Sequence, residues 1–214
     1  MNVLLYLVRH GETTYNAEGR IQGQSDARLS DLGRRQSQAV AESLAALPIE
    51  AVYASPLRRA LETARYIAEM HGLTIQPDPR LMELDAGVFE GRLQSELAAV
   101  HPTELAQWLG GDEDFAIPGG ESRRQLMLRG CEAIRAIASA GHREVVVVSH
   151  GGLISVVLRS LLKLSQPLPP FSLENGSITQ VAVDDRGQFT LISLGRRNCP
   201  PRGLTEIAAN KPAV

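Results

Sequence analysis

The sequence predicts an α/β fold: a three-layer α/β/α sandwich around a mainly parallel sheet, with a small helical lid insertion. Residues 3–8 and 144–149 are continuous apolar runs rich in branched side chains, which is typical of strands covered on both faces. Segments with the apolar spacing of helices alternate with strand-like segments, and this alternation favours a parallel sheet. We therefore expect a single domain over residues 1–214, a lid insertion at residues 87–120 and a loosely ordered tail at residues 198–214.

After its opening strand, the first half of the chain is expected to form a loop at residues 11–30. Helices are expected at residues 32–47 and 55–71, and strands at residues 51–54 and 73–76. Apolar residues from Leu32 to Leu47 fall on one stripe of the first of these helices. Ser55 and Pro56 have the residue types of an N-cap and a first helical position. We therefore expect the second helix to begin there.

In the second half, helices are expected at residues 94–109, 122–140 and 151–164. A loop is expected at residues 110–120, a strand at residues 144–149 and a β-hairpin at residues 178–194. The strand at residues 144–149 reads EVVVVS and is the clearest buried strand of the chain. Within the hairpin, Asp185-Arg186-Gly187 separates two alternating segments and favours a turn.

The composition restricts the partners and the compartment. The 214 residues include 22 Lys+Arg and 24 Asp+Glu, a net charge of −2, and only 4% aromatic residues, which argues against a nucleic-acid partner. No apolar run reaches the roughly 20 residues that span a bilayer, so no membrane partner is expected. Two cysteines, Cys131 and Cys199, are too few for a disulfide framework, and the first residues lack the pattern of a signal peptide. We expect a cytoplasmic protein and leave a homodimer open.

Two buried strands each end in a histidine. The first runs into Arg9-His10-Gly11, and the strand at residues 144–149 runs into His150-Gly151. Ligands of open α/β sheets bind outside the carboxyl ends of the strands. The glycines allow close approach of the backbone, and the helix after His150 can offer N–H groups to an anion. The pattern predicts an anion site at this edge.

A further cation is expected from the helix that follows residues 51–54. Arg58 falls in its first turn, where the helix dipole disfavours a cation unless an anionic ligand is present. With Arg9, His10 and His150 it would form a pocket for a dianion, most plausibly phosphate. Arg59 is interpreted as a solvated helix residue.

Six motifs in order resemble the histidine phosphatase superfamily, also called the phosphoglycerate mutase-like family, and together cover roughly residues 1–165. The motifs are Leu7-Val8-Arg9-His10-Gly11-Glu12-Thr13, Leu29-Ser30-x-x-Gly33, Ser55-Pro56-Leu57-Arg58-Arg59-Ala60, Leu81-Met82-Glu83-Leu84 continuing to Phe89-Glu90-Gly91, Pro118-Gly119-Gly120-Glu121-Ser122, and Val147-Val148-Ser149-His150-Gly151-Gly152. One Arg-His-Gly triplet would be weak evidence, whereas six ordered motifs are specific.

The resemblance implies a role for each site residue. His10 would be the nucleophile and become phosphohistidine, as suits a neutral imidazole. Phosphoryl oxygens would be held by Arg9, Arg58 and His150, with Asn16, Gln22, Gly23 and Gly151 as further phosphate-binding residues, although Gln22 replaces the serine of mutases. Glu83 matches the general acid; the residues alone do not distinguish it from Asp85 or Glu90. No metal or other cofactor is expected, because the arginines already supply the charge that a metal would.

The lid insertion favours a phosphatase over a mutase. Residues 93–122 contain no Lys or Arg and six acidic residues, whereas a mutase needs cations there to retain a substrate with a second anionic group. Leu97, Trp108 and Ile117 are among the apolar residues available to line a pocket for a small organic phosphate. We expect a phosphomonoesterase acting on a small-molecule phosphomonoester. The alternatives are a bisphosphoglycerate-dependent phosphoglycerate mutase and, less favoured, a noncatalytic phospho-ligand binding module.

Overall fold

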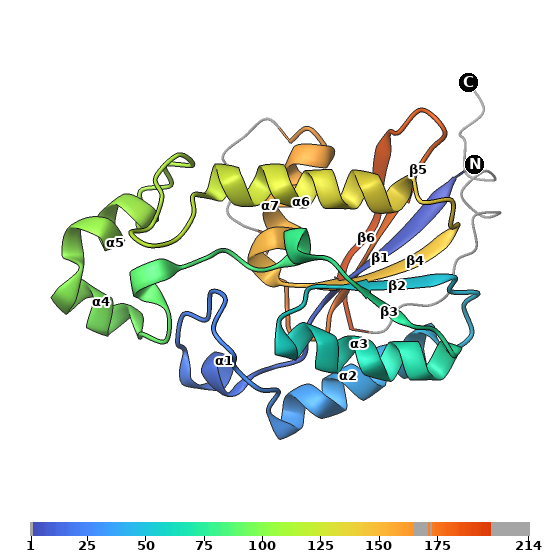
Figure 1. Cartoon of the computed structure of the whole chain (residues 1–214), viewed down its shortest axis with the longest axis horizontal. Coiled ribbons are helices and arrows are strands. Elements are labelled where there is room, and N and C mark those ends of the chain that lie inside the picture. Colours follow the sequence, from blue (N-terminus) through green and yellow to red (C-terminus); the bar gives the residue numbers. More distant parts are fainter. Residues whose placement is uncertain (1, 165–170, 172, 198–214) are drawn as a thin grey trace.

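The computed structural model describes residues 2–164, 171 and 173–197. A six-stranded sheet, in the order β3-β2-β4-β1-β5-β6, forms its centre (Figure 1). Four strands run parallel, and the last two pair antiparallel at one edge; the strands are β1 Val3–Arg9, β2 Ala51–Ala54, β3 Ile75–Pro77, β4 Glu144–Ser149, β5 Ile178–Val183 and β6 Phe189–Arg196. The predicted hairpin is therefore confirmed as β5 and β6.

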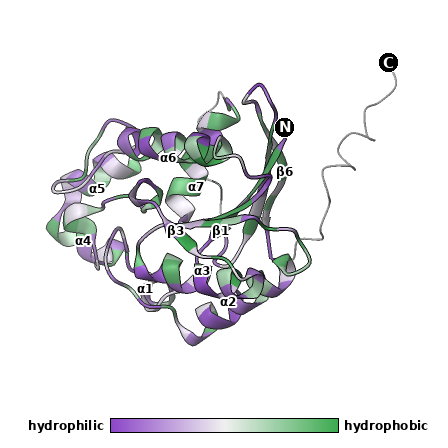
Figure 2. Ribbon diagram, turned by 45° about the vertical axis from the view of Figure 1, so that its right-hand side comes forward, coloured by the Kyte–Doolittle hydropathy of each residue, from purple (hydrophilic) through white to green (hydrophobic). Residues whose placement is uncertain are grey.

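Helices cover both faces of the sheet, which confirms the three-layer sandwich. Alternate residues of β1 face opposite layers: Leu4 and Tyr6 pack with one pair of helices, whereas Leu5 and Leu7 pack with the other pair. The first pair is α2 (Asp31–Leu44) and α3 (Arg58–His71), and the second is α6 (Arg123–Ala138) and α7 (Gly151–Leu161). In Figure 2 the strands are mainly hydrophobic, whereas the covering helices carry both hydrophobic and hydrophilic residues, as burial between layers requires.

Three local expectations are corrected. Helix α3 begins at Arg58 and has no side-chain cap, because Ser55 contacts a histidine instead. A short helix, α1 (Thr14–Glu18), interrupts the expected loop and is closed by a capping box between Thr13 and Asn16. Leu32, expected on the buried stripe of α2, is 42% exposed.

Residues 87–120, called the lid segment below, stand beside the sandwich rather than in its layers (Figure 1). They include η2 (Gly87–Phe89), α4 (Gln94–Val100) and α5 (Pro102–Leu109); a further short helix, η1 (Pro79–Leu81), precedes them. The single expected helix at residues 94–109 is divided at His101, because Pro102 cannot continue a helix and instead begins α5. Phe89, Leu97 and Ile117 form a small core within the lid segment.

The expected tail at residues 198–214, which includes Cys199, lies outside the described residues. Among the helices of the described part, none has the length and apolar character needed to cross a bilayer.

Candidate active site

His10 and His150 lie side by side at the carboxyl ends of β1 and β4. These strands pair in parallel, with Arg9 opposite Ser149, and the backbone N–H of His10 donates to the Ser149 carbonyl at 3.0 Å. The two imidazole rings are 5.1 Å apart between centroids and meet edge to face at 60°. Both are buried, with exposed fractions of 3% for His10 and 0% for His150. The structure thus brings together the two strand-end histidines that the sequence singled out.

The hydrogen bond of His10 determines which ring nitrogen can react. Its Nδ1 lies 2.7 Å from the carbonyl oxygen of Gly11, which can only accept. Nδ1 therefore carries the proton, and Nε2 carries the free lone pair of a neutral imidazole. Burial lowers the pKa of His10 well below its usual value of 6.5, and the positive charges of Arg59 and Arg9 lower the pKa further.

His150 has the opposite tautomer. Arg59 Nε donates to Nδ1 of His150 at 3.3 Å, so the proton lies on Nε2, which donates to the Ser55 hydroxyl oxygen at 2.7 Å. Burial, followed by the charge of Arg59, lowers the pKa of His150 well below 6.5. Both ring nitrogens of His150 thus have partners within the protein, and a contact with a phosphoryl oxygen would replace one of them.

Arg59, and not Arg58, is the cation beside the histidines. Its side chain is 1% exposed, and its two terminal nitrogens donate to the carbonyls of Ser25 at 2.9 Å and Gly23 at 2.6 Å. Burial lowers the pKa of Arg59 to about 10, so the guanidinium stays charged at neutral pH. The interpretation of Arg59 as a solvated residue is therefore wrong.

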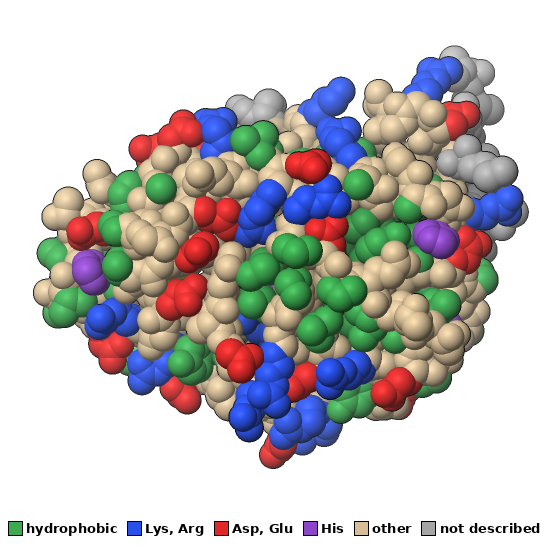
Figure 3. Space-filling view, viewed as in Figure 1, with side chains coloured by type: hydrophobic (Ala, Val, Ile, Leu, Met, Phe, Trp, Pro, Cys, Tyr) green, Lys and Arg blue, Asp and Glu red, His purple; other side chains and the backbone are tan. Residues whose placement is uncertain are grey.

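Arg58 points to the surface. It pairs with Glu62 at 2.7 Å and lies 3.9 Å from Asp26, beside a surface hollow of about 390 Å³ that does not include the histidines. Figure 3 shows cations and acids next to each other over one face of the molecule, as such surface pairs require. The expectation that Arg58 lies in the phosphate pocket is therefore wrong. Successive residues of a helix point about 100° apart, so Arg58 points to the surface when Arg59 points to the histidines.

Arg9 supplies the second cation and is partly buried. One terminal nitrogen donates to the Leu173 carbonyl, while Nε is buried and has no hydrogen-bond partner within the described residues. A Cβ atom at Gly151 would lie 3.2 Å from that Nε, so this glycine allows Arg9 to lie against the start of α7. A buried N–H without a partner is costly, and an anion at this position would satisfy it.

Glu83 reaches the same end of α7. Its carboxylate accepts from the backbone N–H groups of Leu84 at 2.9 Å, Gly152 at 3.0 Å and Leu153 at 3.1 Å. Of the other two candidate acids, Asp85 accepts from the Gly87 N–H two residues along the chain, and Glu90 accepts from the distant Gln24 N–H at 2.6 Å. Only Glu83 is held at the helix start that follows His150.

Asn16 is positioned in part by Asn175, a residue that was not predicted to belong to the site. The Asn16 side-chain oxygen accepts from the Thr13 N–H at 3.1 Å and from Asn175 Nδ2 at 3.2 Å. Asn175 Nδ2 also lies 3.1 Å from the carbonyl oxygen of His10. Gln22 joins the group indirectly, since its side-chain oxygen accepts from the Thr13 hydroxyl at 2.9 Å. The Asn16 amide NH₂ is thereby oriented by the groups that hold its oxygen.

Comparison with known proteins identifies the family. The family model of the histidine phosphatase superfamily (branch 1) matches residues 5–195, which include both histidines, Arg9, Arg59 and Glu83. The chain belongs to the histidine phosphatase superfamily. The resemblance noted in the sequence is thus confirmed.

Relatives within this superfamily carry names of both activities. The chain is 42% identical over 162 residues to a protein of Enterobacter sp. (strain 638) named probable phosphoglycerate mutase GpmB, with 75% of each chain covered. A mycobacterial glucosyl-3-phosphoglycerate phosphatase complexed with VO3 is 34% identical, with a TM-score of 0.80 over 90% of this chain and 98% of that one. A putative alpha-ribazole-5'-P phosphatase of Escherichia coli is 25% identical, with a TM-score of 0.83 over 94% and 99%. These comparisons establish a phosphatase or mutase of the superfamily.

In this member of the histidine phosphatase superfamily, two histidines, two cations and a carboxylate meet at one edge of the sheet. No group of three or more His, Cys, Asp and Glu side chains within the described residues is arranged to hold a metal ion. The positive charge at the site comes from Arg9 and Arg59, which suit the oxygens of a phosphoryl group. The arrangement therefore contains the groups that phosphoryl transfer requires: an unprotonated imidazole, cations and a carboxylate.

Proposed function

We propose that the chain is a metal-independent phosphomonoesterase that hydrolyses a small organic phosphate through a phosphohistidine at His10. The observation that carries this proposal is the buried, neutral His10, whose Nδ1 donates to the Gly11 carbonyl and whose imidazole is under the positive charges of Arg59 and Arg9. Dense positive charge keeps the imidazole unprotonated and also attracts the phosphate dianion. One arrangement thus activates the nucleophile and binds its substrate.

The reaction proceeds in two transfers. First, His10 Nε2 bonds to phosphorus as the ester P–O bond breaks, and protonated Glu83 gives its proton to the departing alkoxide. Arg9 and Arg59 stabilise the phosphoryl oxygens during this transfer. Second, water attacks the phosphohistidine, Glu83 takes a proton from the water, and the N–P bond breaks to release inorganic phosphate. His10 and Glu83 then return to their initial protonation states.

The lid segment supports hydrolysis rather than retention of a doubly anionic substrate. Arg123 and Arg124, which follow the lid segment in the chain, form contacts with residues of that segment. Arg123 lies 5.0 Å over the Trp108 ring and donates to the Trp108 carbonyl at 2.8 Å, while Arg124 pairs with Asp114. Leu97 and Ile117, expected to line a pocket, are instead buried in the core of the lid segment. Cations for a second anionic group are therefore not supplied by residues 93–122.

The relatives named probable phosphoglycerate mutase favour a second candidate, a bisphosphoglycerate-dependent mutase. The test is turnover of 3-phosphoglycerate with added 2,3-bisphosphoglycerate in EDTA, with His10→Ala as the control for contaminating activity. A phosphomonoesterase releases inorganic phosphate in excess of 2-phosphoglycerate, and a panel of sugar phosphates, phosphoserine and phosphoglycerate derivatives then identifies the preferred ester. Isomerisation that outruns phosphate release would favour the mutase, and activity that requires a divalent metal would contradict the proposal.

A further inference from the structure

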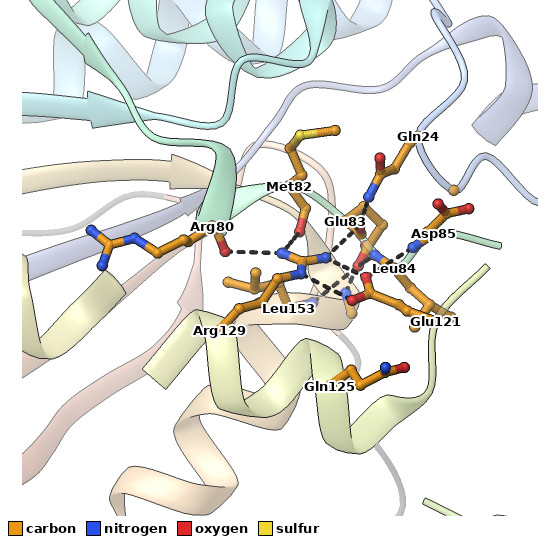
Figure 4. Close-up of polar contacts among 12 residues, drawn as sticks. Gln24, Arg80, Met82, Glu83, Leu84, Asp85, Glu121, Gln125, Arg129 and Leu153 are labelled. Atoms are coloured by element: carbon orange, nitrogen blue, oxygen red, sulfur yellow. Dashed lines mark hydrogen bonds and ion pairs between the residues drawn. The ribbon is translucent and has the colours of Figure 1, made fainter. Parts of the chain in front are cut away.

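Arg129 of α6 lies behind Glu83, and no step of the proposed reaction uses it. Its side chain, 21% exposed, points into the segment that carries Glu83 (Figure 4). The terminal nitrogens donate to the carbonyls of Arg80 at 2.9 Å, Met82 at 2.6 Å and Glu83 at 2.8 Å. A planar guanidinium with five N–H donors can hold several carbonyls in one orientation, which an ammonium group cannot.

Glu121 holds Arg129 in this orientation. Its Oε2 accepts from Arg129 Nε at 3.1 Å, and its Oε1 pairs with the Nη2 group. Glu121 is in turn attached to Asp85, because Oε1 accepts from the Asp85 N–H at 3.0 Å and the Glu121 N–H donates to the Asp85 carbonyl at 3.0 Å. The ion pair thus connects α6 to the backbone on both sides of Glu83.

The segment around Glu83 needs such support because it has no regular structure of its own. It lies between η1, which ends at Leu81, and η2, which begins at Gly87, so its carbonyls have no helical or strand partners. Gln24 Nε2 adds a further donor to the Glu83 carbonyl at 3.1 Å. The backbone of Glu83 is thereby fixed from one side, while the start of α7 holds its carboxylate from the other.

We propose that Arg129 is a positioning residue, which together with Glu121 fixes the backbone at Glu83 so that this carboxyl group meets the leaving oxygen. The inference rests on the proposed function, in which Glu83 is the general acid. Proton transfer requires the acid within hydrogen-bond reach of its target, so a displacement of about 1 Å can cost roughly 10²-fold in rate. Arg129 therefore acts on the reaction through Glu83 and does not touch the substrate.

The test compares kcat/KM for an alkyl and an aryl ester, because this parameter reports phosphoryl transfer to His10. The substrates are glycerol 2-phosphate, whose alkoxide needs a proton, and p-nitrophenyl phosphate, whose leaving group does not. Arg129→Ala and Arg129→Lys should each lose about 10- to 100-fold on the alkyl ester and less than about 3-fold on the aryl ester. Vanadate affinity should stay within about 3-fold, because Arg9 and Arg59 are unchanged. Arg129→Lys keeps the charge near His150 and remains informative if Arg129→Ala does not fold.

A matched control and a double-mutant cycle complete the experiment. Arg124→Ala, on the same helix but paired with Asp114, should match the wild type on both esters. In the Glu83→Gln background, Arg129→Lys should change alkyl-ester kcat/KM by less than about 3-fold, since a residue that acts through Glu83 has nothing further to remove. Equal losses on both esters, or losses that multiply in the double variant, would overturn the inference. If Glu83→Gln alone lacks the ester dependence, the proposed role of Glu83 fails; if Glu83→Gln shows it and Arg129→Lys does not, only this inference fails.

Discussion

The ring of His150 stands edge-on to the ring of His10, with 5.1 Å between centroids. The pairing of β1 with β4 places them there, and both rings share the charge of Arg59. Protonation of either ring would place another positive charge near the guanidinium groups of Arg59 and Arg9. The pair is therefore held neutral, which suits the proposed role of His10 as the nucleophile and leaves the positive charge to the arginines.

The lowered pKa of His10 predicts the acid limb of activity. The free enzyme reacts while His10 is unprotonated, so kcat/KM should hold as the pH falls to 6.5 and decline only below that value. Arg59→Lys keeps a positive charge and should move this limb little, whereas Arg59→Ala removes the charge and should move the limb upward. A pH profile with p-nitrophenyl phosphate measures both. A limb in the wild type above pH 6.5 would contradict the neutral pair.

The same pKa shifts predict how stability depends on pH. The folded pKa values of His10 and His150 lie below 6.5, so the unfolded chain binds more protons in the window beneath that value. This contribution to the free energy of unfolding is intact above pH 6.5 and is lost as the pH falls from 6.5 toward the folded pKa values. Urea unfolding at pH 7.5 and 5.5 should give a smaller difference for His10→Gln than for the wild type. An equal difference would remove His10 from this linkage.

Arg59 and Arg58 should differ sharply although they are neighbours. Arg59→Lys removes the planar guanidinium that donates to His150 and to the carbonyls of Gly23 and Ser25. Because these are charge-assisted hydrogen bonds, we expect vanadate affinity and kcat/KM each to fall by about 10- to 100-fold. Arg58→Lys should stay within about 2-fold of wild type, because the Glu62 pair is exposed. Calorimetric titration with vanadate measures the affinities. A larger effect at Arg58 would restore that residue to the phosphate pocket.

Gly152 provides the space for the Glu83 carboxylate. A Cβ atom at Gly152 would lie 2.5 Å from Glu83 Oε1, so Gly152→Ala must displace the acid although the helical backbone accepts alanine. We expect a loss of about 10²-fold in kcat/KM for glycerol 2-phosphate, with vanadate affinity retained. Wild-type turnover by Gly152→Ala would show that the acid does not need this position.

Asn175 should matter for phosphate binding through Asn16. Asn175→Ala removes the donor to the Asn16 oxygen and to the His10 carbonyl, so Asn16 loses part of its fixed orientation. The expected result is a rise of about 3- to 10-fold in KM, corresponding to a hydrogen bond of about 1 kcal/mol, with a smaller change in kcat. Steady-state kinetics on p-nitrophenyl phosphate measures this. A loss confined to kcat would argue for a role at His10 instead.

Helix phase explains why one arginine was assigned to the wrong place from the sequence. Residues Arg59, Thr63 and Ile67 recur every four positions and are all buried, so they lie on the face of α3 toward the sheet. Arg58 and Glu62 are on the neighbouring, exposed face. A helical stripe drawn through Arg59, Thr63 and Ile67 would have placed Arg59 on the buried face. The helix dipole argument, in contrast, considers only the turn in which an arginine falls and not the face on which it lies.

Other features could not be read from local patterns. The strand-end histidines were predictable, because parallel strands of buried character bring their carboxyl ends together. Ser55, by contrast, has the residue type of an N-cap, and its contact with His150 depends on the register of β2 against β4. Arg129 is 46 residues from Glu83 in the chain and Asn175 is 165 residues from His10, and no local pattern connects either residue with the site.

The most direct test of the central claim is to trap the phosphoenzyme. Wild-type protein mixed with p-nitrophenyl phosphate and quenched in base within milliseconds should carry one phosphate that is stable in base, labile in acid and located on His10 by mass spectrometry. His10→Ala should carry none and should lose about 10⁴-fold or more in turnover, because no neighbouring group can replace the covalent intermediate. Full turnover by His10→Ala, or the trapped phosphate on another residue, would contradict the account.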